Sequence, residues 1–544
     1  MLVTPQCRQC LPSVRAAEAS RTPSARSLGH TRRNWLRTTL LVCVTGSQAV
    51  SAAAQSPAPS DSSGAVERYV DSHQRAIVSQ LVEFCSIPNV ASDTENIERN
   101  ASFARDLLAR RGFRTEKLTT GGNPFIYGRL DVPGARRTIL LYGHYDGVPV
   151  DPRHWKQKSP FVPVLRDGRM EDGAKEIGGL KSLTQFKPEW RLYARSAADS
   201  KSPIVALGAA LDALKAAGVA PTANIRVLLD GDQESNSPNL PEVIAAHREK
   251  LTADMLILLD GLVHQSGRPT VLFGARGNIL LELTTYGPKA VVHSGHYGNW
   301  VPNPDLRLAR LLASMKDDEG QVLVKGFYDG LEALSPEEEA ILRAVPDDEP
   351  RLMKLFGIAQ PERQGRSLQQ GLQLPTLNIR GMSSAYVGLD ARTIIPDTAT
   401  AALDLRLVKE TPASAMIEKI LAHIRGLGYY VTESDPVDAT RAANPRIVKV
   451  VVRSGSEAYR TSPTLPESRL VVDTLARVFG ETPVQIRTSG ATHPAAAPLM
   501  KAFGFPVLSL GIANFDNNQH GENENLQLGY LFAGIRSIAA VLSM

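Results

Sequence analysis

The chain has 544 residues, which is too long for one ordinary domain, so two or more domains are expected. Hydrophobic residues make up 43% and charged residues 22%, ordinary values for a globular protein, and no apolar run approaches the length of a clean membrane span. The formal net charge is +5, but residues 1–55 hold seven arginines and one acid, so the rest of the chain carries −1. The basic charge therefore belongs to the N-terminal segment, and nucleic-acid binding gains no support from it.

The N-terminal segment is ordered like an export signal. RRNWL at residues 32–36 precedes a modestly apolar stretch, residues 39–50, and the small residues of SAAAQ at 51–55 suit cleavage by a signal peptidase. The arginine pair followed by an aromatic residue and leucine resembles a twin-arginine signal. We therefore predict an export signal over residues 1–54, a flexible linker over 55–64, and a periplasmic or secreted protein. The alternatives are a disordered basic tail and a cytoplasmic enzyme that starts further along the chain.

Helices and strands alternate between residues 65 and 271. Amphipathic or small-residue patterns predict helices there, and short apolar runs predict strands. The predicted helices are residues 66–84, 96–111, 203–217 and 240–250, and the predicted strands are 125–130, 138–143, 224–229 and 254–259. Strands that alternate with helices imply a mostly parallel sheet covered on both faces, so we predict an α/β domain.

The pattern changes near residue 272 and changes back near residue 440. The segment between is expected to form an α+β module, after which the α/β pattern resumes. The module's predicted elements are strands 278–285, 376–379, 398–407 and 429–432 and helices 304–315, 336–344 and 413–427; helices 466–478 and 525–543 and strands 484–486 and 506–510 follow. We predict one domain in two parts, residues 65–271 and 436–544, with the module inserted at 272–435.

Candidate metal ligands lie near the ends of the predicted strands. The run TILLYGHYDGVP at residues 138–149 places His144 directly after a buried strand, with Asp146 on the same side to orient the imidazole. Ligand sites in open α/β sheets form beyond such ends, although an ordinary solvated His–Asp pair explains this run equally well. Further candidates follow other strands: Asp199, Glu234, Asp260 and His520. Singly each acid fits a helix cap or a loop, but two imidazoles and three carboxylates together match a dinuclear zinc site.

These motifs, in this order, resemble one known family, the dinuclear zinc metallopeptidases related to glutamate carboxypeptidase, aminoacylase and carnosine dipeptidase (peptidase family M20). The resemblance spans about residues 70–544. Its motifs are HYD at 144–146, RSAADSK at 195–201, QESNS at 233–237, DG at 260–261 and HGENE at 520–524. It implies two zinc ions bridged by Asp199, with Asp146 orienting one histidine. The implied ligands are His144, Asp199 and Asp260 for one ion and Asp199, Glu234 and His520 for the other.

The inserted module also resembles this family, and the resemblance implies an α/β catalytic domain with an inserted ferredoxin-like lid that forms a homodimer. ARGN at 275–278 and HSGHYG at 293–298 resemble the start of that lid. In the family the first histidine of the second motif, here His293, reaches the partner subunit's active site and supports the developing oxyanion. A loop histidine before a turn is the alternative interpretation.

Two further motifs resemble parts of the family that bind the substrate. DLRLV at 404–408 resembles a strand whose arginine, here Arg406, binds the substrate carboxylate, which a guanidinium fork suits. SGATHP at 489–494 resembles, less faithfully, a glycine-rich substrate loop, in which Thr492 is the candidate contact. An arginine on a strand is otherwise usually a solvated residue.

Position 233 departs from the family. The family's catalytic base is the first glutamate of E-E-x-G-S, and Gln233 stands in its place. A glutamine cannot accept a proton from the attacking water, which is the general-base step. Asp232 precedes it, but on an extended segment its side chain is expected to face away. A hydrolase with an altered base, a very slow enzyme and a zinc protein without turnover all remain open.

Together these features predict an exported zinc-dependent amidohydrolase that uses a metal-activated water to cleave a dipeptide, a small peptide or an N-acyl amino acid. The long lid insertion, residues 317–372, resembles the dipeptidase branch of the family and favours dipeptides. The alternative is a catalytically impaired zinc-binding protein, for which Gln233 is the chief support. Both interpretations expect two divalent metal ions, and neither involves nucleic acid or a stable membrane anchor.

Overall fold

The computed structural model describes residues 60–362 and 367–544. The predicted export signal at 1–54 and residues 55–59 of the predicted linker lie outside this part of the chain. Residues 60–64, predicted as the rest of that linker, instead form the first residues of helix α1 (Ser60–Cys85). Within the described ranges, no helix combines the length and the apolar character that crossing a membrane requires.

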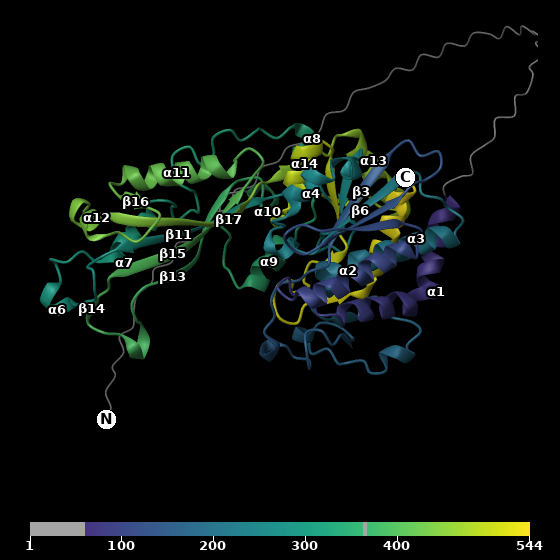
Figure 1. The fold of residues 1–544 in the computed structure, drawn as a ribbon, viewed down its shortest axis with the longest axis horizontal. Coiled ribbons are helices and arrows are strands. Elements are labelled where there is room, and N and C mark those ends of the chain that lie inside the picture. Colours follow the sequence, from purple (N-terminus) through teal and green to yellow (C-terminus); the bar gives the residue numbers. More distant parts are fainter. Residues whose placement is uncertain (1–59, 363–366) are drawn as a thin grey trace, which may run out of the picture. The chain divides into compact units, whose positions relative to one another are not determined.

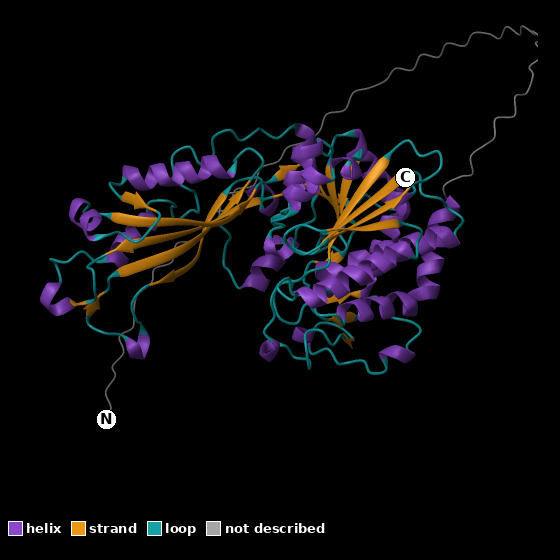
Figure 2. Ribbon diagram, in the orientation of Figure 1, coloured by secondary structure: helices purple, strands orange, loops and turns teal. Residues whose placement is uncertain are grey.

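The larger sheet has eight strands in the order β1-β2-β6-β3-β7-β20-β9-β19. Figures 1 and 2 show this sheet at β3 and β6, with helices packed beside it. These strands are β1 (Arg114–Leu118), β2 (Phe125–Leu130), β3 (Thr138–His144), β6 (Asn224–Asp230), β7 (Met255–Leu258), β9 (Thr270–Leu272), β19 (Val484–Ile486) and β20 (Val507–Leu510). The neighbours β6, β3, β7 and β20 are parallel to one another, whereas β1–β2, β2–β6 and β20–β9 are antiparallel. The carboxyl ends of the four parallel strands therefore meet at one edge, where ligand sites form in α/β sheets.

Both faces of the larger sheet are buried, because its central strands are apolar at nearly every position. Leu141 and Val227 face one hydrophobic core, and Leu140 and Leu228 face the other. The first core is completed by α1 (Ser60–Cys85), α2 (Thr94–Ala109), α3 (Ser202–Ala216), α13 (Pro466–Phe479) and α15 (Leu528–Leu542), and the second by α4 (Leu240–Ala246), α5 (Arg248–Leu251) and α14 (Ala496–Phe503).

The smaller sheet has five strands in the order β13-β15-β11-β17-β16. They are β11 (Gly277–Tyr286), β13 (Thr376–Ser383), β15 (Thr398–Leu407), β16 (Tyr430–Thr432) and β17 (Ile447–Ser456). Every second residue of β15, from Ala399 to Leu407, is buried, which is the pattern of a sheet covered on one face. The cover consists of α7 (Pro304–Ala313) and α11 (Ala413–Gly426). The edge strand β13 is exposed from Asn378 to Ser383.

Short elements complete the described fold. They are β4 (Val164–Arg166), β5 (Arg191–Tyr193) and β22 (Asn525–Gln527) in one small sheet, the pairs β8 (Leu262–Val263) with β21 (Ala513–Asn514), β10 (Gly274–Ala275) with β18 (Tyr459–Arg460) and β12 (Val292–His293) with β14 (Ile394–Ile395), and the helices α6 (Ser294–Tyr297), α8 (Pro336–Ala344), α9 (Glu349–Phe356), α10 (Leu368–Gly371) and α12 (Asp438–Ala443). Helix α8 begins at a capping box in which Ser335 and Glu338 satisfy each other's backbone N–H groups.

Three local features differ from the sequence predictions. The single helix predicted over 240–250 is broken at His247, and the helix predicted from residue 525 begins only at Leu528, after strand β22. Strand β17 lies beyond the predicted module boundary at residue 435 and pairs with β11. Its alternating sequence suits a half-buried antiparallel strand, but only the pairing reveals which sheet it joins.

Candidate metal centre

His144 ends β3 and is fully buried. Its Nδ1 atom lies 3.2 Å from Oδ1 of Asp146, and its Nε2 atom lies 3.1 Å from Oδ1 of Asp199. The other Asp146 oxygen accepts a hydrogen bond from the backbone N–H of Glu234 at 2.9 Å. Asp146 therefore orients the imidazole and ties two loops together, an arrangement typical of metal-binding histidines.

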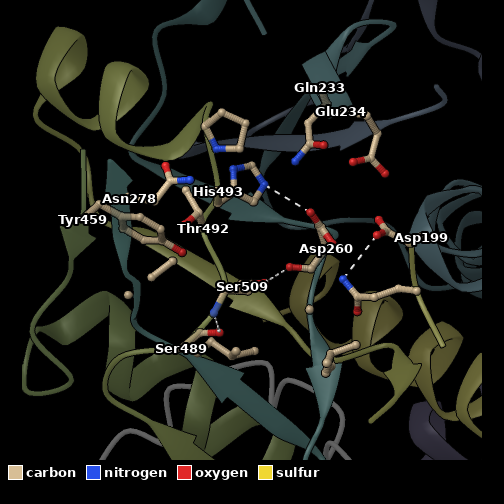
Figure 3. Close-up of a pocket in the computed structure, with 18 of the residues that line it drawn as sticks. Asp199, Gln233, Glu234, Asp260, Asn278, Tyr459, Ser489, Thr492, His493 and Ser509 are labelled. Atoms are coloured by element: carbon tan, nitrogen blue, oxygen red, sulfur yellow. Dashed lines mark hydrogen bonds and ion pairs between the residues drawn. The ribbon is translucent and has the colours of Figure 1, made fainter. Parts of the chain in front are cut away.

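Two groups of potential metal ligands meet at one cavity and share Asp199. The first group is His144, Asp199 and Asp260, the second is Asp199, Glu234 and His520, and the ligand atoms within each group lie within 4.8 Å of one another. The Nε2 atom of His520 is 3.1 Å from Asp199 and 3.3 Å from Glu234. Figure 3 shows the carboxylates of Asp199, Glu234 and Asp260 around the same space. All five ligands predicted from the sequence are thus brought together.

The acids of the two groups repel one another. Burial and the nearby Asp199 carboxylate raise the pKa of Glu234 to about 8 and the pKa of Asp260 to about 6. Burial alone would also raise the pKa of Asp199, but contacts with His144 and His520 lower it below its usual range. Three carboxylates, of which Asp260 is one-quarter exposed, face only two imidazoles, so the charge and the donor atoms of this set fit two divalent cations.

The larger sheet delivers most of these ligands to one edge. His144 ends β3, Glu234 follows β6 and Asp260 follows β7, and β3 pairs in parallel with both neighbours. His520 comes instead from the loop between β21 and β22 and adopts a positive φ of 63°, which residues other than glycine seldom do. His144, Glu234 and Asp260 are far apart in the sequence, but the parallel pairing of β3 with β6 and β7 brings their side chains to the same edge of the sheet.

Glu524 and Arg195 support Asp199, the candidate ligand that both groups share, although no separate role was predicted for them. One Glu524 oxygen accepts hydrogen bonds from the backbone N–H groups of Ala198 and Asp199, both at 3.0 Å. The other accepts from the backbone N–H of Ser196 at 3.1 Å and from Arg195 at 2.7 Å. Both charged residues are almost completely buried, so this pair holds the segment that carries Asp199. The sequence signal that could have identified them is their position: Arg195 is the first residue of the motif at 195–201, and Glu524 is the last residue of the motif at 520–524.

Gln233 lines the cavity beside the ligand groups, and Asp232 does not. The Asp232 carboxylate accepts hydrogen bonds from the backbone N–H and the side-chain amide of Asn123, at 2.9 and 2.7 Å. A third contact, from the amide of Asn239, is 3.3 Å long. These amides hold Asp232 away from the ligand groups. The predicted direction holds but the predicted reason does not, because the segment is not extended: Asp232 precedes a single 3-10 turn over Gln233–Ser235.

Arg406 and Thr492 also line this cavity, whose volume is about 390 Å³. Arg406 donates to the Thr492 hydroxyl at 3.0 Å and pairs with Asp404 at 3.0 Å. About a third of the Arg406 side chain remains exposed, so its guanidinium can still meet an anion in the cavity.

His293 lies elsewhere. It ends β12, is exposed, and its Nδ1 accepts a hydrogen bond from the backbone N–H of Gly295 at 3.0 Å. It is absent from the cavity lining, so this chain's own fold does not bring it to the ligand groups.

Two candidate ligand groups at the strand ends of an α/β sheet, with an α+β module inserted in the chain, are the arrangement expected of a metal-dependent hydrolase. Residues 177–544 match the profile of "Peptidase family M20/M25/M40", and the chain belongs to this family. Membership confirms the resemblance predicted from the motifs. It makes the protein a hydrolase of peptide bonds and implies the use of divalent metal.

Named relatives match along most of the chain. Identity is 23% over 484 residues with the Cys-Gly metallodipeptidase dug1 of Schizosaccharomyces pombe, covering 86% of this chain and 95% of the relative. It is 25% over 501 residues with the Beta-Ala-His dipeptidase of Homo sapiens, covering 87% and 91%. The solved M20 metallo-carboxypeptidase Sso-CP2 from Sulfolobus solfataricus aligns with a TM-score of 0.70 and 26% identity, covering 86% and 98%. The predicted α/β fold class is thereby confirmed, and these relatives lend no support to a protein without turnover.

Proposed function

We propose that the protein is a two-metal dipeptidase that cleaves dipeptides or other short peptides with a free carboxyl terminus. The observation that carries the proposal is the pair of ligand groups that share Asp199. The names of the relatives, which are Cys-Gly and Beta-Ala-His dipeptidases, support dipeptides over larger substrates. N-acyl amino acids carry the same amide and carboxylate and form the second substrate class to test.

Two sets of residues in the cavity would contact different parts of such a substrate: the ligand groups would face the scissile amide, and Arg406 would face the carboxylate. The ions expected here are zinc, which when bound polarises the scissile carbonyl and activates water for attack. His144, Asp199 and Asp260 would hold one ion, and Glu234 and His520 would complete the second site with Asp199. Arg406 would bind the substrate carboxylate through its planar fork, with Thr492 fixing the guanidinium. A volume of about 390 Å³ suits a small molecule and not a folded protein.

A direct test is to purify the mature protein, load it with zinc and assay a panel of dipeptides and N-acyl amino acids. Turnover in wild type that is abolished in His144→Ala would support the proposal. If wild type shows none and Gln233→Glu creates activity, the protein is a catalytically impaired zinc binder instead, because the glutamate restores the missing proton acceptor.

We also propose that two copies pair through the smaller sheet. The edge strand β13 exposes Met382 at 58% and Ile379 at 48%, and an exposed apolar edge is a ready template for another chain. Pairing would let His293 of a second copy enter the cavity. Mixing inactive His293→Ala with inactive His144→Ala protein tests this, because hybrid dimers would regain one complete site. No recovery in a mixture that exchanges subunits would contradict it.

Finally, we propose export by a twin-arginine signal over residues 1–54, supported by the RRNWL sequence and by the small residues at 51–55. Mass spectrometry of the N-terminus of protein from the native cell tests it. A mature start near residue 55 is expected, and a start upstream of Arg32 would exclude export by this route.

A further inference from the structure

His493 is a buried imidazole without a hydrogen-bond partner in the wall of the same cavity. The residue is only 6% exposed, and neither ring nitrogen makes a hydrogen bond. Its Nε2 atom lies 3.5 Å from Oδ2 of Asp260, and Figure 3 shows the ring directed at that carboxylate. Polar groups buried in this way are unfavourable unless something bound in the cavity completes them. A neutral imidazole offers one hydrogen-bond donor and one acceptor.

The surrounding fold fixes this ring in place. The Tyr142 ring packs against it edge to face, with 5.3 Å between the ring centroids. Tyr142 is itself held by its hydroxyl, which donates to the buried Asp230 at 2.7 Å. On the other side, the neighbouring Thr492 is held by Arg406. The imidazole therefore keeps one direction toward the ligand groups.

Among the imidazole and carboxylate side chains that line the described cavity wall, His493 lies outside the two ligand groups. Four other imidazole or carboxylate residues line it, and all belong to the two ligand groups: Asp199, Glu234, Asp260 and His520. Gln233 lines the same cavity (Figure 3) but offers an amide where a carboxylate is expected from the family motif. Asp232 is occupied by Asn123. Of the cavity-lining residues that the structure describes, His493 is thus the imidazole or carboxylate left for other work.

We propose that His493 is a further catalytic residue, whose Nε2 accepts a hydrogen bond from the water that attacks the scissile carbonyl. This contact would orient the water on the side of the cavity where Gln233 replaces a glutamate. The inference rests on the proposed hydrolytic function and deepens it. His493 belongs to SGATHP at 489–494, the run that resembles the family's glycine-rich substrate loop less faithfully.

Three substitutions separate the contact from mere filling of space. His493→Leu keeps the bulk and removes both nitrogens. His493→Gln places an amide atom near the position of Nε2, and His493→Asn places one near Nδ1. The matched control is His423→Leu. His423 lies on α11, outside the cavity, and its Nε2 atom is 2.9 Å from the Ser314 hydroxyl. Each zinc-loaded protein is assayed for kcat and KM on the best dipeptide, and its zinc content and melting temperature are measured.

We expect His493→Leu to lower kcat about 10-fold to 100-fold, the effect of one lost hydrogen bond in a water-poor site, with KM changed less than about threefold. His493→Gln should recover most of that loss, and His493→Asn should not. Zinc content should match wild type throughout.

Other results would overturn the inference. Unchanged kcat in His493→Leu would mean that the ring does not touch the reacting water. Equal activity of the His493→Gln and His493→Asn variants would exclude a specific role for Nε2. Loss of zinc from both the His493→Leu and the His493→Gln variant would show that the ring holds Asp260 in place and does not act on the water. Wild-type protein without turnover would overturn the proposed function itself, whereas wild-type turnover insensitive to these variants would overturn only the role of His493.

Discussion

The two ligand groups of the metal centre differ in how they are built. In the first, the His144 side chain is completely buried, Asp260 is one-quarter exposed, and both follow directly from strands of the larger sheet. In the second, the His520 side chain is 54% exposed and projects from a loop in which Asn518 and Asn523 also have positive φ. Asp199 belongs to both groups, so it joins a rigid half to an accessible half.

This difference separates two properties that a two-metal site needs. A ligand fixed at the end of a buried strand holds its ion in one geometry, because the sheet cannot move without losing its core. A ligand on an exposed loop can adjust while substrate enters and product leaves. We therefore expect the ion of the first group to exchange slowly and the ion of the second to exchange quickly.

The largest effect is expected from Asp199→Ala, which removes the carboxylate common to both halves. Both sites lose a ligand and a charge, so zinc content should fall sharply and activity should drop at least about 1000-fold. Emission spectroscopy of the dialysed protein measures the zinc. A variant that still binds two ions tightly would contradict the shared role of Asp199.

The comparison is sharpest between His144→Ala and His520→Ala. The first should lose the buried ion and most of the activity. The second should keep the buried ion and lose the accessible one, because its ligand is the exposed one. Zinc content after dialysis against a weak chelator distinguishes them, with His423→Ala as the control. Identical zinc retention in both variants would remove the proposed difference between the halves.

A smaller effect is expected from Glu524→Gln. The substitution removes the ion pair with Arg195 and one of two acceptors that hold the backbone around Asp199. Metal affinity should fall about 10-fold to 100-fold, as for other groups that position metal ligands. Competition with a zinc chelator measures it. Glu522→Gln is the matched control because Glu522 is exposed two residues away, and an equal loss there would exclude a specific role for Glu524.

Arg406 lines the cavity but belongs to neither ligand group. Arg406→Lys should therefore weaken substrate binding and leave the zinc content unchanged. A lysine keeps the charge but loses the fork, so KM for dipeptides should rise about tenfold. Peptides with an amidated carboxyl terminus should show little change. Arg453→Lys is the control, because Arg453 is exposed and pairs with Glu282 outside the cavity. An equal rise in KM for amidated peptides would contradict carboxylate binding.

The smallest effect concerns Glu410, which pairs with Arg460 away from both ligand groups. Burial would raise the pKa of Glu410, but the hydrogen bond from Arg460 holds it below the usual 4.5. Because the folded pKa is depressed, this contribution to stability is present above that value and is lost as pH falls below it. Glu410→Gln should therefore cost about 1 to 2 kcal/mol at pH 7 and less at pH 4, measured by urea unfolding.

The matched control for that measurement is Glu418→Gln. The pair of Glu418 with Arg425 is 3.9 Å long and exposed, so its loss should change the free energy of unfolding little at either pH. A cost for Glu410→Gln that stays constant between pH 7 and pH 4 would show that the charge of Glu410 does not supply the stability.

Local sequence signals predicted most elements of the fold. The predicted strand over residues 398–407 and the predicted helix over residues 336–344 coincide with β15 and α8. The sequence signals failed where the neighbouring strand determines which sheet a strand joins. Strand β17 is an example, because its alternating pattern is compatible with either sheet. They also failed at His247, where a helical pattern continues although the chain turns.

The amino-acid sequence alone determined the family and singled out the five candidate ligands, because each candidate sits in a short motif that can be recognised by its order and spacing without any structure. Only the tertiary structure decided which side chains face the cavity. Asp232 and Gln233 are adjacent in sequence, yet hydrogen bonds from Asn123, 109 residues away, turn one aside while the other lines the cavity. His493 became a candidate in the same way, because burial and the absence of a partner are properties of packing between distant segments and not of any motif.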